Sequence, residues 1–408
     1  MSVSSQLEGS LQQAPAGAFV SVERRGCSRE FALLLHCCRP LYCKADRDRI
    51  LPLLGAGLDW MHLLESANHH GATPFVYQRL AEAKLDRLVP AESWALIEQQ
   101  FHTHLRHNLF LVGQLRSILE ALDSAGIPAI PFKGPALATA LWGHLGLRQC
   151  VDLDILVAPK HVLAAMEALH NLGYEPGIRL NSSVWGEHIR VASEMPLRKT
   201  NSEMLLELQW DIAPRCFAVE IGMNESWKRA AVSECNGMSV LSFAPEDLLL
   251  ALCVHGWKHE WSRLIWVSDV ARLIVQNPGL DWAAILARSK HYGVKRILSL
   301  GVSLAHELLG SPLPEAIDET AQADAELECL LQQARRGLGE NRQVSYIGWH
   351  LFLLRARERW RDRIRHAVRF VFTPGVPELT AIALPRPLHG LYPVMRVLRL
   401  GKQLVASD

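Results

Sequence analysis

Two aspartates stand two positions apart in the run Val151–Val157, which has the sequence Val-Asp-Leu-Asp-Ile-Leu-Val. The apolar residues around them predict a strand, so Asp152 and Asp154 project from the same face of it. Two neighbouring carboxylates repel each other unless positive charge lies between them. Mg²⁺ supplies such charge and is typically held by one or two carboxylates together with substrate phosphates. The pair therefore predicts a metal site for a substrate that carries phosphate.

A second element, upstream of the aspartates, has the chemistry of an anion site. Residues 127–132 form a short apolar run that predicts a strand, and Pro135 is typical of the first position of a helix. Between them, Lys133 and Gly134 form a turn at the helix start, where backbone N–H groups and the lysine charge attract anions. Arg148 follows the helix, and its guanidinium suits bidentate contact with phosphate. The alternative for Arg148 is an ion pair with the nearby aspartate that only holds the strand.

These motifs, taken in order, resemble a known superfamily. Lys133-Gly134, a short helix with Ala-Leu, a Gly-x-Arg ending at Arg148, and Asp152-x-Asp154 with three apolar residues behind it are similar to polymerase-β-like nucleotidyltransferases. The pattern is most similar to the uncharacterised nucleotidyltransferase family of bacterial proteins. The abortive-infection type of nucleotidyltransferase toxin has a similar spacing. One departure is that the superfamily's usual Gly-Ser at the helix start is replaced here by Lys133-Gly134-Pro135.

A third carboxylate is expected in residues 204–212, MLLELQWDI, whose alternation predicts a strand with one buried and one polar face. The polar face carries Glu207, Gln209 and Asp211. In the resembling family this segment runs roughly Asp-Leu-His-Trp, which puts Glu207 at the third carboxylate and Gln209 in place of the histidine. Asp211 is a reserve candidate on the same face.

The resemblance and the spacing together imply a reaction. The enzyme would move a nucleoside monophosphate from an NTP to an acceptor hydroxyl or phosphate and release pyrophosphate. Asp152 and Asp154 would hold Mg²⁺ on the nucleotide, and a second Mg²⁺ that also contacts Glu207 would activate the acceptor. Lys133, Gly134 and the arginine at 148 would bind the nucleotide, because phosphoryl transfer depends mainly on positioning and charge neutralisation.

A second constellation lies in residues 254–263, VHGWKHEWSR. His255 and His259 are four residues apart and share one helical face. This spacing can bind zinc, but the glutamate of a His-Glu-x-x-His motif is missing and no third ligand is evident. The segment resembles the family's His-Gly and Lys-His pattern, which implies that Lys258 contacts the nucleotide phosphates and that His255 lies near the base or sugar. The alternative is that the histidines cap the helix or fill the core.

A long helix is predicted over residues 344–371, with an apolar stripe along one face. The other face carries Arg355, Arg359, Arg363 and Arg369. This basic face could bind RNA. Because Glu358 and Asp362 mix with the arginines and no aromatic residue interleaves with them, a solvated face is favoured.

Composition limits the class of protein. The chain has 408 residues, of which 49% are hydrophobic, and its net charge of +1 provides no global attraction to nucleic acid or membrane. Nine cysteines without a CxxC pair predict thiols in a reducing compartment. The N-terminus has no apolar signal core, and the longest apolar stretch, residues 248–254, is too short to span a bilayer. We therefore expect a cytoplasmic protein with no membrane partner.

The predicted fold class is α/β (α+β), with a small mixed sheet in a nucleotidyltransferase core. We expect a leader at 1–27, helical regions at 28–126 and 216–373 around a core at 127–215, and an irregular basic tail at 374–408. Additional strands are predicted near 188–191 and over 195–198. Helical periodicity is present in residues 28–38, 59–70, 90–125, 159–172, 246–261, 263–276, 282–292, 294–309 and 321–338.

Two functional alternatives accompany the main hypothesis. A toxin-like nucleotidyltransferase would modify tRNA or a protein, with the basic helix guiding the acceptor. A catalytically inactive nucleotide- or peptide-binding module would keep the fold without the chemistry, and the departures at 133–135 and at Gln209 favour it. In every version that keeps activity, the substrate is an NTP and the acceptor is a small molecule, a peptide or RNA.

Overall fold

The computed structural model describes residues 27–41, 44–55, 57–200, 202, 204–340 and 345–405. Nearly all of the expected leader, and Cys43, lie outside these residues. The chain forms two compact units. Unit 1 is built from Met1–Gln100, Trp261–Leu280 and Ser299–Gln343, and unit 2 from Phe101–Glu260, Asp281–Leu298 and Val344–Asp408. The domain boundaries expected from the sequence remain predictions.

Unit 1 is helical. Its elements are α3 (Arg29–Cys37), α4 (Lys44–Gly55), α5 (Trp60–His70), α6 (Thr73–Glu82), the start of α7 (Ala91–Ser124), α13 (Leu264–Gln276), most of α15 (Lys295–Leu309), α16 (Glu315–Ala323) and α17 (Ala325–Glu340). Side-chain caps begin two of these helices, because Ser28 accepts from the Phe31 N–H at 3.1 Å and Asp59 accepts from the His62 N–H at 3.0 Å.

Unit 2 contains a five-stranded mixed sheet in the order β1-β2-β5-β4-β3. The strands are β1 (Ala129–Pro131), β2 (Leu153–Val157), β3 (Tyr174–Pro176), β4 (Glu194–Lys199) and β5 (Leu205–Gln209). Strands β2 and β5 are parallel, and the other pairs are antiparallel. A separate ribbon pairs β6 (Ala231–Cys235) with β7 (Met238–Ser242). The expected α+β class with a small mixed sheet is confirmed.

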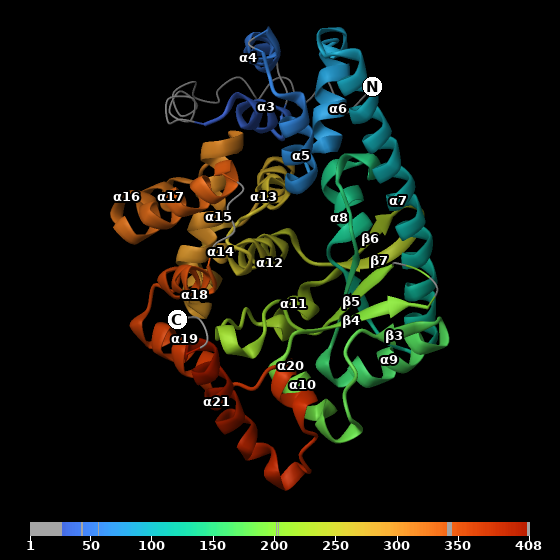
Figure 1. The fold of residues 1–408 in the computed structure, drawn as a ribbon, viewed down its shortest axis with the longest axis vertical. Coiled ribbons are helices and arrows are strands. Elements are labelled where there is room, and N and C mark those ends of the chain that lie inside the picture. The colour runs from blue at the N-terminus through green and yellow to red at the C-terminus, as the bar shows by residue number, and fades with distance from the viewer. Residues whose placement is uncertain are drawn as a thin grey trace. The chain divides into compact units, whose positions relative to one another are not determined.

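Helices account for most of the rest of unit 2. They are the rest of α7, α8 (Gly134–Leu137), α9 (Val162–Asn171), α10 (Trp185–Val191), α11 (Met223–Arg229), α12 (Pro245–Lys258), α14 (Trp282–Tyr292), α18 (Tyr346–Arg355), α19 (Trp360–Phe372), α20 (Val376–Ala381) and α21 (Tyr392–Val405). Figure 1 shows α7 running alongside the strands and the helices α18 to α21 following one another at the end of the chain.

The two faces of the sheet differ in chemistry. The core-facing side chains alternate along the strands and are Leu153, Ile155 and Val157 on β2, Leu206 and Leu208 on β5, and Met195 and Leu197 on β4. Helices α7 and α9 contribute Leu111, Leu115, Ile118, Leu122, Val162, Ala165 and Leu169 to the same core. Because side chains alternate between faces, the intervening residues Asp154, Glu207 and Glu194 lie on the opposite face. Burial of the apolar set thereby gathers the carboxylates on one surface.

Three sequence-based elements differ in the structure. The strand expected near 188–191 is the end of helix α10. The helix expected over 344–371 is two helices, α18 and α19, with a turn between them. The tail expected to be irregular from 374 forms α20 and α21.

No helix in the described part of the chain is both long enough and apolar enough to cross a bilayer. Every cysteine that the structure describes is a free thiol.

Candidate active site

Asp154 and Glu207 face each other across two neighbouring strands. They are register partners in the parallel pair of β2 with β5. The Gln209 side-chain amide donates to Asp154 Oδ1 at 2.8 Å and to Glu207 Oε2 at 2.9 Å. Asp154 is only 2% exposed, so the pair lies in a setting where charge interactions are strong.

Lys133 provides the positive charge at this pair. Its Nζ lies 2.6 Å from Asp154 Oδ1, and the lysine precedes α8 as the residue at the helix start. The adjacent Gly134 has a φ of +62°, and a Cβ at that position would lie 3.1 Å from the carbonyl oxygen of Asp152. Glycine is therefore required both by the backbone conformation and by the close approach to the second aspartate. After Leu137 the helix continues as a π-helical turn, a feature frequent at functional sites.

The carboxylates of the site repel one another. Burial, followed by the Asp154 charge, raises the pKa of Asp152 to about 6. Burial, followed by the charges of Asp154 and Glu194, raises the pKa of Glu207 to about 7. Burial acts to lower the pKa of Lys133, but the Asp154 carboxylate outweighs it and the pKa is raised. The lysine is thus fully charged while the carboxylates remain undercompensated.

Helix α12 brings two further residues to this region. Lys258 Nζ lies 3.6 Å from Glu194 Oε2, and Glu194 is the register partner of Gln209 on β4. Burial, followed by the Lys133 charge, lowers the pKa of His255 well below its ordinary value. His255 is therefore neutral, and its ring centroid lies 4.8 Å from that of His259.

Arg148 is held by the loop that precedes β2. The Asn108 amide of α7 donates to the carbonyls of Leu145 at 2.5 Å and of Arg148 at 2.8 Å. The Arg148 side chain is 6% exposed, with Nη1 3.8 Å from Cys150 Sγ, and its charge contributes to lowering the pKa of Asp152. The Arg148 charge therefore acts on Asp152, the aspartate with which the alternative interpretation pairs it.

Comparison with protein families supplies the context for this geometry. The model of the family described as "Uncharacterised nucleotidyltransferase" matches residues 56–310. The chain belongs to the uncharacterised nucleotidyltransferase family. It is therefore a nucleotidyltransferase, and its family implies an NTP substrate. No curated protein and no solved structure matches the chain.

The matched segment contains every residue that the sequence placed in the site of this nucleotidyltransferase. The structure brings Lys133, Asp154 and Glu207 into one network, with Gly134 packed on the Asp152 backbone. Charge interactions that shift pKa values link these residues to the rest of the set, which comprises Asp152, Arg148, His255 and Lys258. The catalytic and binding roles of these residues stay predictions.

Asp211, the reserve candidate, lies elsewhere. It follows the end of β5 in a turn, where its Oδ1 accepts from the Ile212 N–H at 2.7 Å. Burial raises its pKa to about 6. It lines a cavity of about 420 Å³ together with Pro159, Trp210, Arg215 and Trp227. Because Pro159 and Asp211 follow the carboxyl ends of the parallel strands, this cavity lies beyond the opposite end of β2 from Asp152.

Two residues of the network were not selected from the sequence. Glu194 belongs to β4, and only the register of β4 with β5 places it beside Gln209. Asn108 lies fully buried on the core face of α7, and a polar residue within an apolar helical stripe is the feature that could have indicated it.

The donor chemistry suits a hard divalent cation. Oxygen atoms of Asp152, Asp154 and Glu207 are the ligand type that Mg²⁺ prefers, and their mutual repulsion is what a cation relieves. Among the residues that the structure describes, however, no three His, Cys, Asp or Glu side chains are arranged as a ready metal cage. Mg²⁺ usually needs only one or two carboxylates plus substrate phosphates, so the residues fit a metal that arrives with the nucleotide. Within the part of the chain that the structure describes, no third ligand of these types joins His255 and His259 in a zinc site.

Proposed function

We propose that this nucleotidyltransferase is Mg²⁺-dependent and transfers a nucleoside monophosphate from an NTP to an acceptor hydroxyl or phosphate. The acceptor oxygen forms a bond to the α-phosphorus, the bond from that phosphorus to the bridging oxygen breaks, and pyrophosphate leaves. The observation that carries the proposal is the opposed pair of the buried Asp154 and the half-buried Glu207, which lies beside a lysine and is linked by one amide.

Asp152, Asp154 and Glu207 are the proposed metal ligands and catalytic residues. When bound there, Mg²⁺ neutralises charge on the phosphates and lowers the pKa of the acceptor oxygen. Burial and carboxylate repulsion raise the pKa of Glu207 to about 7, and a cation held there would relieve that repulsion. Glu207 would then act as a ligand, and the acceptor's proton would leave to solvent.

Lys133 has the role of a charge that changes partners. The Lys133 Nζ is 2.6 Å from Asp154, so a cation that binds this carboxylate would have to displace the lysine. We expect the lysine to turn from Asp154 to the triphosphate when the nucleotide arrives. Arg148, Lys258 and the Gly134 turn bind phosphate oxygens, and neutral His255 contacts the base or sugar by hydrogen bonds.

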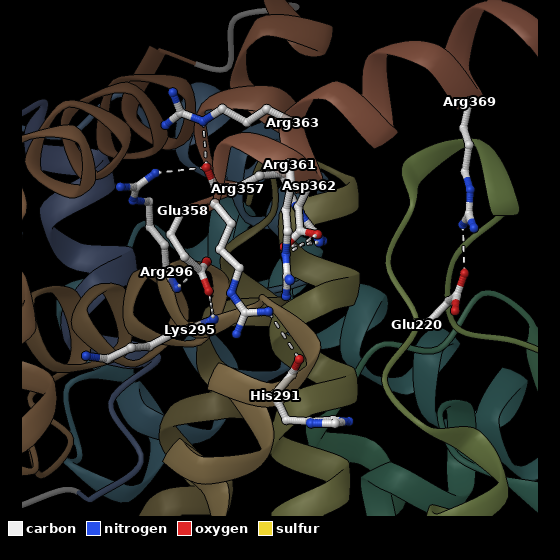
Figure 2. A network of polar contacts seen from close by, with 11 residues as sticks. Glu220, His291, Lys295, Arg296, Arg357, Glu358, Arg361, Asp362, Arg363 and Arg369 are labelled. Atoms are coloured by element: carbon white, nitrogen blue, oxygen red, sulfur yellow. Dashed lines mark hydrogen bonds and ion pairs between the residues drawn. The ribbon is translucent and has the colours of Figure 1, made fainter.

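The toxin-like alternative depends on RNA or protein as the acceptor. The arginines that the sequence offered for RNA contact protein groups instead. Arg363 Nε donates to the Arg357 carbonyl at 2.7 Å, Arg359 Nη1 donates to the His291 carbonyl at 3.3 Å, and Arg369 Nη1 donates to Glu220 Oε1 at 2.7 Å. Figure 2 shows the contact of Arg363 with Arg357 and, apart from it, the pair of Arg369 with Glu220. This arrangement favours a small-molecule or peptide acceptor over RNA guided by that helix.

The binding-module alternative draws on Gln209 and on the Lys133–Asp154 pair, which could satisfy the site without chemistry. An experiment separates it from an enzyme. The protein is incubated with each NTP labelled on the α-phosphate, with Mg²⁺ and a cell extract, and the label is followed into RNA, protein and small molecules.

The expected result is transfer of label to a small molecule or peptide that requires Mg²⁺ and is absent with Asp154→Asn. Label in tRNA would favour the toxin-like enzyme. Tight NTP binding without transfer to any fraction would contradict the proposal and favour the binding module.

A further inference from the structure

Helix α19 turns its apolar side chains away from the protein. Trp360, Ile364, Val368 and Phe372 are spaced four residues apart, which places them along one face. They are 75%, 54%, 50% and 52% exposed, and Trp360 is the most exposed large apolar residue of the described chain. A surface helix normally buries such a face and exposes its polar side.

The polar face of α19 is buried instead. Asp362 and His366 are 4% and 1% exposed. Asp362 Oδ2 lies 3.7 Å from the buried Arg357, and the His366 ring stacks on Phe217 with 5.9 Å between centroids. These contacts determine the orientation of the helix, so its exposed apolar face is a consequence of packing and not of fraying.

Helix α21 repeats the arrangement. Its Arg396 is 7% exposed, donates to the Phe370 carbonyl of α19 at 2.8 Å and lies over the Phe370 ring. Val394 and Leu398, on the other side of the same helix, are 55% and 63% exposed. The two helices therefore pack on each other through polar groups and present apolar side chains outward.

We call Trp360, Ile364, Val368, Phe372, Val394 and Leu398 the α19–α21 surface. A cluster of exposed large apolar side chains on two helices that pack together is typical of a binding surface in a protein. Over half of the exposed large apolar residues in the described chain fall between 351 and 398.

The charge around this surface indicates what it binds. Arg361, Arg365, Arg386 and Lys402 are exposed in residues 355–402, whereas none of the three acidic residues of this segment is exposed. The segment contains eleven arginines and lysines in all, of which Arg357 and Arg396 are buried, although the whole chain has 43 basic against 42 acidic residues. The rest of the chain is therefore net negative. Arg361 and Arg365 are exposed and border the apolar face of α19. An apolar face with a tryptophan and flanking arginines is typical of a helix that lies in the headgroup region of an anionic membrane.

We propose that the α19–α21 surface docks this nucleotidyltransferase onto an anionic lipid bilayer, with both helices parallel to the membrane plane. This contact is peripheral, since no described helix can span a bilayer. The expectation of no membrane partner rested on the net charge and on the lack of a spanning stretch, and neither of these tests peripheral contact. A second copy of the chain is a poorer occupant, because two copies of the same basic surface would repel each other.

Vesicle sedimentation with the full chain tests this proposal. Phosphatidylcholine vesicles are compared with vesicles in which about one third of the lipid is phosphatidylglycerol. We expect binding to the anionic vesicles that is roughly tenfold stronger than to the neutral ones and that weakens with added salt. The double variant Ile364→Asp with Val368→Asp should lose roughly tenfold or more of this binding.

Val232→Asp is the matched control, because Val232 is 71% exposed on β6 and does not belong to the surface. It should bind vesicles like the unmodified protein. Thermal unfolding checks that both proteins are folded, and Arg361→Glu with Arg365→Glu tests the charge separately by removing the preference for anionic lipid.

Several results would overturn the proposal. They are absence of binding to any vesicle, equal binding by the Ile364/Val368 variant and the control, and equal binding to neutral and anionic lipid. A dimer in light scattering without lipid that the Ile364/Val368 variant abolishes would assign the surface to a second copy instead. Nucleotide transfer in solution is measured in parallel, and its loss in the double variant would show damage to the enzyme rather than to docking.

Discussion

Asp154 and Glu207 are register partners on adjacent parallel strands although 53 positions separate them in the chain. Their side chains share the Gln209 amide, and Lys133 approaches the pair from the Asp154 side. A carboxylate pair with one buried member and a single lysine beside it is undercompensated, which is the electrostatic condition that a bound cation relieves. The predictions below concern this condition and the elements that maintain it.

Asp154→Asn should lower nucleotide transfer by roughly a thousandfold, because it removes a charged ligand from the reacting phosphates. It also leaves the buried Lys133 without its closest counter-charge, so we expect a loss of about 1–3 kcal/mol in the free energy of unfolding. Transfer is measured with labelled NTP and stability by urea unfolding.

Asp211→Asn is the matched control for this substitution. Asp211 is a half-buried aspartate whose pKa is also raised, but it lines the cavity beyond β5. Transfer by this variant should remain within about threefold of the unmodified enzyme, since effects far from the reacting groups are small. A thousandfold loss with Asp211→Asn and none with Asp154→Asn would refute the assigned site.

Gly134→Ala should damage the site through the backbone. The residue has a φ of +62°, and the added Cβ would lie 3.1 Å from the Asp152 carbonyl oxygen. Left-handed backbone costs a residue with a Cβ about 1–2 kcal/mol, and relief of the contact moves the strand that carries the aspartates. We expect transfer to fall by roughly a hundredfold.

Gly143→Ala separates the effect of the Cβ contact from the effect of the left-handed backbone conformation. Gly143 has a φ of +66°, but nothing lies within 4 Å of a Cβ placed there. The two variants should lose similar stability in thermal unfolding, whereas only the one at Gly134 should lose transfer. Equal transfer by both variants would show that the Asp152 contact does not matter.

The carboxylate pair was predictable because the alternation of side chains along a strand can be recognised from neighbouring residues alone. The run MLLELQWDI puts every second residue on one face, and burial of Leu206 and Leu208 leaves Glu207 on the other. The same rule failed for Asp211, because the strand ends at Gln209 and alternation does not extend into the turn.

The turn between α18 and α19 was not predictable in this way. Residues 355–359 are mostly good helix formers, so their sequence favours continuation. The break is stabilised by groups distant in the chain. Arg296 Nη1 donates to the carbonyls of Arg355 and Arg357, and Glu358 accepts from the N–H groups of Lys295 and Arg296. Figure 2 shows the contacts of Arg296 with Arg357 and of Glu358 with Lys295 and Arg296.

Helical period likewise does not state which face is buried. The sequence shows both the apolar stripe through Trp360 and Ile364 and the arginines on the opposite face. Which of the two faces contacts the protein depends on two other residues. Phe217 stacks on the inward residue His366, and Arg357 pairs with the inward residue Asp362.

His366→Phe should make the protein more resistant to mild acid. Burial, followed by the Arg357 charge, lowers the pKa of His366 from 6.5 to about 4. Between these values the unfolded chain binds a proton that the folded protein does not, so stability falls as pH decreases from about 6.5 toward 4. At pH 5 this group costs about 2 kcal/mol relative to pH 7.5, and phenylalanine removes that cost. Urea unfolding at both pH values measures it, and an identical loss in the variant would contradict the assignment.

Gln209→Glu tests the electrostatic condition of the site directly. It places a third carboxylate between Asp154 and Glu207, where the amide now donates to both. Without Mg²⁺ we expect the free energy of unfolding to fall by about 2 kcal/mol, because like charges repel in a buried setting. Added Mg²⁺ should restore stability, since a ligand that binds only the folded state raises its unfolding free energy. Gln209→Met removes the same two hydrogen bonds without adding charge, so its loss of stability should not depend on Mg²⁺ beyond that of the unmodified protein. Thermal unfolding of the three proteins with EDTA and with Mg²⁺ makes the comparison, and an equal Mg²⁺ response from the Glu and Met variants would show that these carboxylates do not form the metal site.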